Sequence, residues 1–192
     1  MAHKDSVISR QLFPFLAQSP ELIYLDSAAL TPIIQPALDA LHSAYTHSFG
    51  PINRSMYQHA ERATSTYEAA RERIALWLGI KPHELSFTLN TTYALYLAAH
   101  SLVPQLIDKN PLKRTVVLTS VNHHSHWSVW HELAQRYDLE IRVLQVLPGG
   151  VIPPHELKKI DDTVLLAALT PVSNVYGNIL LGEVLEAASS HS

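Results

Sequence analysis

The sequence predicts an α/β fold built on a mostly parallel sheet with helices on both faces. Two observations carry this prediction. The hydrophobic period switches repeatedly between helical and strand-like along the chain. Several strand-like stretches are apolar on both sides, which is the pattern of a sheet covered on both faces. In such sheets ligands bind at the carboxyl ends of the strands, so the residues just after each strand are the candidates for function.

The N-terminal part is predicted to be mainly helical. A short helix is expected near Val7–Leu16, before a brief extended segment at 22–26. Pro32 and Pro36 permit a helix that runs to about Tyr45, because proline fits a first turn, where N–H groups have no partner within the helix.

The longest predicted helix spans Met56–Leu78. This stretch is rich in Ala, Glu and Arg, and its apolar residues Tyr67, Ala70 and Ile74 recur at helical spacing. Gly79 is expected to end it, since glycine takes the left-handed conformation that closes many helices.

Beyond Gly79 the pattern alternates strand and helix. Strands are predicted where β-branched and apolar residues alternate or run together, and helices where the apolar spacing lengthens to three or four residues. The predicted strands cover residues 85–89, 115–119, 141–147 and 164–169, and the predicted helices cover residues 92–102, 125–137 and 154–160.

Composition limits the function classes. A chain of 192 residues with 47% hydrophobic and 16% charged residues can bury a core. Its net charge of -3, with the two signs interspersed, gives no basic stripe for nucleic acid. The absence of cysteine excludes disulfides, thiolate metal sites and cysteine nucleophiles within these residues. We see neither a signal peptide nor an apolar run of membrane-spanning length, and expect a cytoplasmic protein without a membrane partner.

Three polar clusters each follow a predicted strand. In the first, Asn90-Thr91-Thr92, the N–H groups and hydroxyls of a helix start could hold a phosphate. Ordinary helix capping is the alternative. In the last cluster Asn174 could donate a hydrogen bond to a phenolic oxygen, with a simple turn before Gly177 as the alternative.

The middle cluster runs from Asn122 to His126. His123 could stack its ring on an aromatic cofactor and move protons near neutral pH, with His124 and His126 in supporting or surface roles. One alternative is an ordinary loop histidine in a chain with 12 of them. Another is a metal site at His123, His126 and His131, which the spacing disfavours because His123 and His126 do not share a helical face.

The order of these motifs resembles the cysteine desulfurase and class V aminotransferase family of pyridoxal-phosphate (PLP) enzymes. The segment 24–29 is similar to the family's Tyr-Leu-Asp-x-Ala-Ala, and Asn53-Arg54-Ser55 to its His-Arg-Gly or Asn-x-x-Arg segment. The most specific match is 170–177, which resembles Thr-His-Val-Ser-Asn-Val-x-Gly. Together the motifs cover residues 22–185.

The resemblance implies roles for individual residues. Thr91 and Thr92 would hold the phosphate of PLP, and His123 would be the catalytic histidine stacked on its pyridine ring. Asn174 would bond the ring O3′, and Arg54 would contact the substrate. The chain departs from the family pattern at several positions: asparagine stands at 90 where a glycine is usual, tyrosine at 93 and asparagine at 122 where a glutamate is usual.

No lysine follows Lys159, whereas the second half of the family supplies the Schiff-base lysine and the aspartate that pairs with the pyridinium nitrogen. We therefore expect the N-terminal half of a fold-type I PLP-dependent transferase. Residues 1–21 would be an N-terminal extension and residues 22–192 a partial large domain. The parent reaction would act on an amino acid, for instance by removing sulfur from cysteine, and would need a complementing chain. The alternatives are a truncated remnant without catalysis and an interaction module that keeps the fold.

The resemblance also predicts how the strands pair. It places 115–119, 141–147 and 164–169 side by side, and leaves 85–89 without its neighbour and 164–169 at an apolar edge. We expect a homo-oligomer or a complex with a chain that supplies the C-terminal half.

Overall fold

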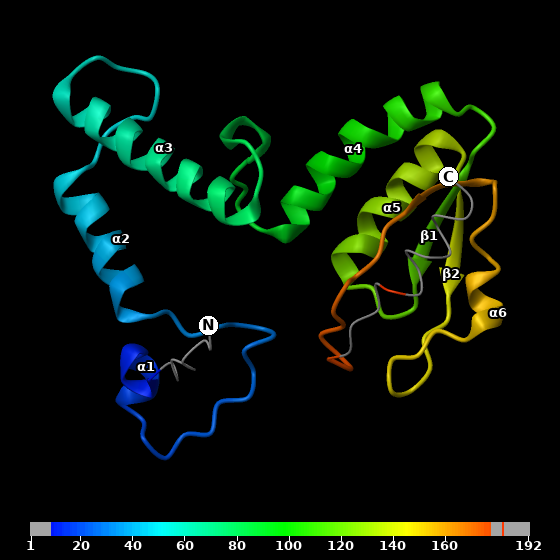
Figure 1. The fold of residues 1–192 in the computed structure, drawn as a ribbon, viewed down its shortest axis with the longest axis horizontal. Coiled ribbons are helices and arrows are strands. Elements are labelled where there is room, and N and C mark those ends of the chain that lie inside the picture. The colour runs from blue at the N-terminus through cyan, green and yellow to red at the C-terminus, as the bar shows by residue number, and fades with distance from the viewer. Residues whose placement is uncertain (1–8, 178–181, 183–192) are drawn as a thin grey trace, which may run out of the picture. The chain divides into compact units, whose positions relative to one another are not determined.

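The computed structural model describes residues 9–177 and 182. They belong to two compact units, Met1–Ser86 and Phe87–Ser192 (Figure 1). The first residues of the helix predicted from Val7 lie outside the described residues. The division into an extension at 1–21 and a partial domain at 22–192 stays a prediction.

The first unit is helical, as the sequence predicts. Its elements are η1 (Arg10–Leu12), α1 (Pro14–Ala17), α2 (Gln35–His47), α3 (Gln58–Leu78) and η2 (Pro82–Glu84). The first predicted helix is two short pieces, because extended backbone at Phe13 (φ -106°, ψ 100°) separates them. Gly79 closes α3 in the left-handed conformation (φ 71°), as expected.

Little apolar surface is buried in the first unit. On α3 only Ala60, Ala63 and Ala75 are buried, and α2 buries none of its residues. The apolar side chains Leu41 and Tyr45 of α2 are 55% and 69% exposed. They lie four residues apart, so they share one helical face.

The second unit is the α/β layer structure that the sequence predicts. Its elements are α4 (Thr91–Lys109), β1 (Thr115–Thr119), α5 (His124–Tyr137), β2 (Glu140–Leu144), α6 (Pro154–Leu157) and β3 (Val164–Ala167). The three strands are parallel and lie in the order β2-β1-β3, with Val116 of β1 opposite Ile141 on one side and Leu166 on the other. The predicted neighbour relations of these strands are confirmed.

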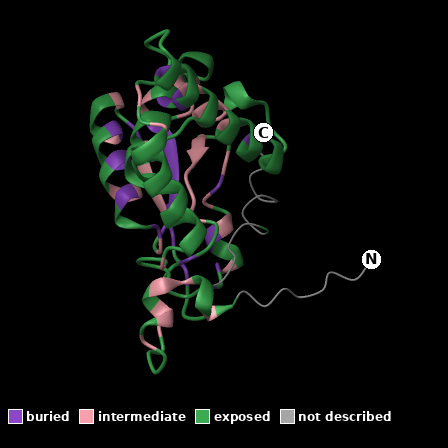
Figure 2. Ribbon diagram, turned by 90° about the vertical axis from the view of Figure 1, so that its left-hand side faces the viewer, coloured by how far each residue is buried: buried purple, intermediate pink, exposed green. Residues whose placement is uncertain are grey.

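Both faces of this sheet are covered. β1 is buried along its whole length, and its arrow is drawn in purple in Figure 2. On one face Val116 and Leu118 pack with residues of α4 and α5, among them Val103 and Leu133. On the other face Val117 packs with Leu144, Val146, Ile152 and Ile160 around α6. Burial of β1 from both sides explains its continuous apolar sequence.

Two elements differ from the sequence-based prediction. Residues 85–88 are neither helix nor strand, because a strand needs a neighbour to accept its hydrogen bonds and no described residue pairs with them. The helix predicted at 92–102 continues through Pro104 to Lys109. Proline removes one hydrogen bond there, but Val103 is fully buried and Ile107 packs on the same core, so tertiary packing sustains the helix.

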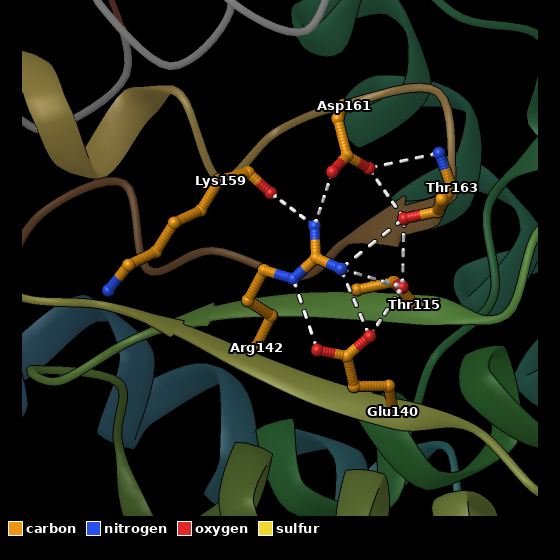
Figure 3. A network of polar contacts seen from close by, with 6 residues as sticks. All are labelled: Thr115, Glu140, Arg142, Lys159, Asp161 and Thr163. Atoms are coloured by element: carbon orange, nitrogen blue, oxygen red, sulfur yellow. Dashed lines mark hydrogen bonds and ion pairs between the residues drawn. The ribbon is translucent and has the colours of Figure 1, made fainter.

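A polar network fastens the amino ends of the strands (Figure 3). The guanidinium of Arg142 donates to Glu140 at 3.0 Å, to Asp161 at 2.9 Å and to the Lys159 carbonyl at 2.8 Å. The hydrogen bond from Arg142 lowers the pKa of Glu140, and hydrogen bonds from Thr163 and then from Arg142 lower the pKa of Asp161. The network ties β2 to the turn before β3.

Candidate functional site

The three predicted polar clusters meet at one pocket in the second unit. The pocket has a volume of about 410 Å³. The residues that line it are Asn90, Thr91, Thr92, His123, Ser125, His126, Thr170 and Pro171. They come from the start of α4, the start of α5 after β1, and the segment after β3, so the convergence expected at the carboxyl edge of a parallel sheet is present.

The start of α4 presents free hydrogen-bond donors to this pocket. Asn90 caps the helix, and its Oδ1 accepts the N–H of Tyr93 at 2.9 Å. Capping is therefore one real role of Asn90. The N–H groups of Thr91 and Thr92 have no acceptor among the described residues. Unpaired N–H groups at a helix start, with the positive end of the helix dipole, favour an anion.

The hydroxyls of Thr91 and Thr92 are also free within the described part of the chain. Inside a helix a threonine hydroxyl can bond the carbonyl four residues earlier, as Thr66 does with Arg62 at 2.9 Å and Thr46 with His42 at 2.8 Å. In a first turn no helical carbonyl lies four residues earlier. The position of Thr91 and Thr92 thus leaves two hydroxyls and two N–H groups beside one cavity.

His123 is held by the start of its own helix. Its Nδ1 accepts the N–H of Ser125 at 3.2 Å and lies 2.9 Å from the Ser125 hydroxyl. Because Nδ1 is an acceptor, the proton of the neutral ring is on Nε2. The exposed ring of His123 therefore has a free N–H donor at Nε2, because both contacts with Ser125 use Nδ1.

His126 lines the same pocket from the first turn of α5. Its Nδ1 is buried and finds no hydrogen-bond partner in the described part of the chain, and the same is true of the Thr170 hydroxyl oxygen. Burial, and then the neighbouring charge of His123, lower the pKa of His126, which favours its neutral form at neutral pH. Unpaired polar atoms, free helix-start donors and histidine rings make a donor set that fits a phosphorylated aromatic ligand.

Three of the predicted site residues, Thr91, Thr92 and His123, lie together at this pocket. Asn174 does not line it, and lies in an exposed turn where the Ser173 hydroxyl accepts the N–H groups of the two residues after Asn174, each at 3.2 Å. Arg54 is an exposed residue of the other unit, in the bend before α3.

Sequence reasoning missed the pocket roles of Ser125, His126, Thr170 and Pro171. All four lie within the motif segments 122–126 and 170–177, but no role at the pocket was given to them. His126 was expected in a supporting or surface role, and it is a half-buried pocket residue.

No metal site is present in the part of the chain that the structure describes. No group of three or more His, Cys, Asp or Glu side chains there could hold a metal ion, so His123, His126 and His131 do not form one. The Nδ1 of His131 lies 2.9 Å from the carbonyl of Trp127. Among the described helices, none has both the length and the apolar character that crossing a membrane requires.

The lysines of the described residues are not part of the pocket lining. Lys159 is engaged elsewhere, since its Nζ donates to Glu156 at 2.6 Å and to the Val143 carbonyl at 3.1 Å.

Comparison with known proteins identifies relatives along almost the whole chain. The family model described as Aminotransferase class-V matches residues 23–189. A probable cysteine desulfurase of Haemophilus influenzae is 34% identical over 171 residues, which are 88% of this chain and 38% of that protein. A probable cysteine desulfurase of Pseudomonas aeruginosa is 36% identical over 158 residues, which are 81% of this chain and 38% of that protein.

Solved structures show the same fold. The apo cysteine desulfurase of Thermococcus onnurineus superposes with a TM-score of 0.79 at 26% identity, covering 95% of this chain and 44% of that one. The cysteine desulfurase CsdA of Escherichia coli, in its S-sulfonic acid form, gives a TM-score of 0.73 at 27% identity, covering 95% and 45%. The chain thus spans less than half the length of the relatives it matches.

Proposed function

Because the chain belongs to the class-V aminotransferase family, we propose that its pocket holds the phosphate and ring of PLP in an enzyme of the cysteine desulfurase type. The observation that carries this proposal is the set of free donors of Thr91 and Thr92 in the same cavity as His123. Relatives named as cysteine desulfurases support an amino acid, and cysteine first, as the substrate.

Each residue has a proposed task. The N–H groups and hydroxyls of Thr91 and Thr92 bind the phosphate. The ring of His123 stacks on the pyridine ring, and its Nε2 holds or moves a proton. Asn174 binds the ring O3′ and Arg54 contacts the substrate; these two assignments rest on the resemblance. When bound, PLP draws electrons from the α-carbon of the amino acid.

The proposal requires residues beyond these 192. The lysine that attaches PLP covalently and the acidic partner of the ring nitrogen would come from further residues of the fold, on the same polypeptide or on a second one. The alternative, a non-catalytic interaction module that keeps the fold, is favoured if the pocket binds no phosphorylated pyridine.

We also propose that the exposed apolar face of α2, with Leu41 and Tyr45, is covered in the working assembly. Burying apolar surface contributes roughly 25 cal/mol per Å², so an uncovered face favours association. The 192-residue polypeptide is expected to sediment as a homo-oligomer at micromolar concentration. A compact monomer with cooperative melting would contradict this expectation.

The pocket assignment is tested with pyridoxamine 5′-phosphate, which needs no lysine to bind. Calorimetric titration is expected to show that His123→Ala weakens binding by about 2- to 12-fold, because aromatic stacking contributes roughly 0.5–1.5 kcal/mol. The control His131→Ala removes a histidine of the same helix that lies outside the pocket lining, and should bind as the unmodified protein does. Equal effects of the two substitutions would exclude the stacking role.

A further inference from the structure

Asn122 is a buried polar side chain that joins the ends of two strands. It follows β1 closely, and only 7% of its surface is exposed. Its Nδ2 donates to the carbonyl of Ala168, just after β3, at 2.7 Å. Its Oδ1 accepts the N–H of Thr119, the last residue of β1, at 3.1 Å, and also the hydroxyl of Thr119.

Both strand ends lead directly into the pocket. His123 follows Asn122 in the sequence, and Thr170 comes two residues after Ala168. The paired register of β1 and β3 ends at Val117 and Ala167. Beyond that point the amide of Asn122 supplies a link between the segment after β1 and the segment after β3.

The link depends on the chemistry of an amide. An asparagine side chain donates and accepts at the same time, whereas an ionised carboxylate only accepts. Asparagine at 122 can therefore hold the Ala168 carbonyl and the Thr119 N–H at once, which an ionised carboxylate could not do.

We propose that Asn122 is a positioning residue of the pocket, whose amide holds the segment with Thr170 and Pro171 against the start of α5. His123 and Thr170 then face the same ligand. This inference rests on the proposed function, because the pocket is the one assigned to the phosphorylated pyridine.

The experiment compares Asn122→Asp and Asn122→Leu with the unmodified protein, by titration with pyridoxamine 5′-phosphate at pH 8 and pH 5.5. At pH 8 both variants are expected to bind about tenfold more weakly, because the Ala168 carbonyl loses its donor. Burial and the facing Ala168 carbonyl raise the pKa of a carboxyl at this position, the two donor groups of Thr119 lower it, and the aspartic acid, which is protonated to a larger fraction at pH 5.5 than at pH 8, donates again. At pH 5.5 the affinity of Asn122→Asp relative to the unmodified protein should therefore recover, and that of Asn122→Leu should not.

The control is Asn110→Asp, the same change at the exposed C-cap of α4, which should match the unmodified protein at both pH values. Unchanged binding by Asn122→Leu would overturn the proposal, because the loss in Asn122→Asp would then come from its charge alone.

A second readout needs no ligand. The backbone amide resonances of Leu169 and Thr170 are expected to shift in Asn122→Leu, and their constancy would also overturn the proposal. If the unmodified protein binds no pyridoxamine 5′-phosphate, the proposed function fails, and these resonances still decide whether Asn122 positions the segment.

Discussion

Replacing both Thr91 and Thr92 with valine is expected to weaken the binding of pyridoxamine 5′-phosphate by at least about 100-fold. Hydrogen bonds to a charged group contribute roughly 1.5–3 kcal/mol each, and the double substitution removes two hydroxyl donors. Valine has nearly the shape of threonine and a similar helix propensity, so α4 should persist. Calorimetric titration measures the loss.

The matched control for this double variant is Thr66→Val in α3. The hydroxyl of Thr66 bonds a carbonyl of its own helix and lies in the other unit, so its removal should leave the affinity unchanged. A loss of less than about threefold in the double variant would mean that the two hydroxyls do not bind the phosphate, since even one neutral hydrogen bond contributes about 1 kcal/mol.

Leu118→Ala is expected to lower the free energy of unfolding by about 3 kcal/mol, within the range of about 2–5 kcal/mol for buried leucines. Leu118 is fully buried in β1, in the core that α4 and α5 share with the sheet. A domain is stable by only about 5–15 kcal/mol, so this loss is a large part of the margin. Urea denaturation followed by circular dichroism measures it.

Leu112→Ala is the control for core packing, because Leu112 is 92% exposed. Its effect should stay within about 0.5 kcal/mol. If the two alanine variants unfolded at the same urea concentration, this would contradict the burial of Leu118 between β1 and the helices α4 and α5.

The layer structure was predictable because a strand that is buried on both faces has a continuous apolar sequence. β1 reads as a continuous apolar and β-branched run since both of its faces are covered. The strand predicted at 85–89 was wrong for a complementary reason. Its alternating sequence is suited to a sheet, but, as the resemblance predicted, the segment has no neighbour: no described residue pairs with it. The helix predicted at 92–102 was too short, because the burial of Val103 outweighs the hydrogen bond that Pro104 removes.

The site was predictable in part for a topological reason. Parallel strands end at one edge, so polar residues after different strands were expected to meet, and His123 after β1 and Thr170 after β3 do. Thr91 and Thr92 join them from the start of α4, although the residues before α4 form no strand. The inward position of His126 and the contact between Asn122 and Ala168 depend on how α5 and the segment after β3 pack. No local sequence pattern encodes either of them.

Following the backbone amide resonances of the isotope-labelled protein during titration with pyridoxamine 5′-phosphate is the most direct test that this pocket binds the cofactor. The expected result is a saturable shift confined to the start of α4, the start of α5 and the segment after β3, with Thr91, Thr92, His123 and Thr170 among the residues affected. Resonances of the Arg142 network at the opposite ends of the strands should stay in place. No saturable shift, or shifts centred on residues outside the pocket, would contradict a PLP site in this chain.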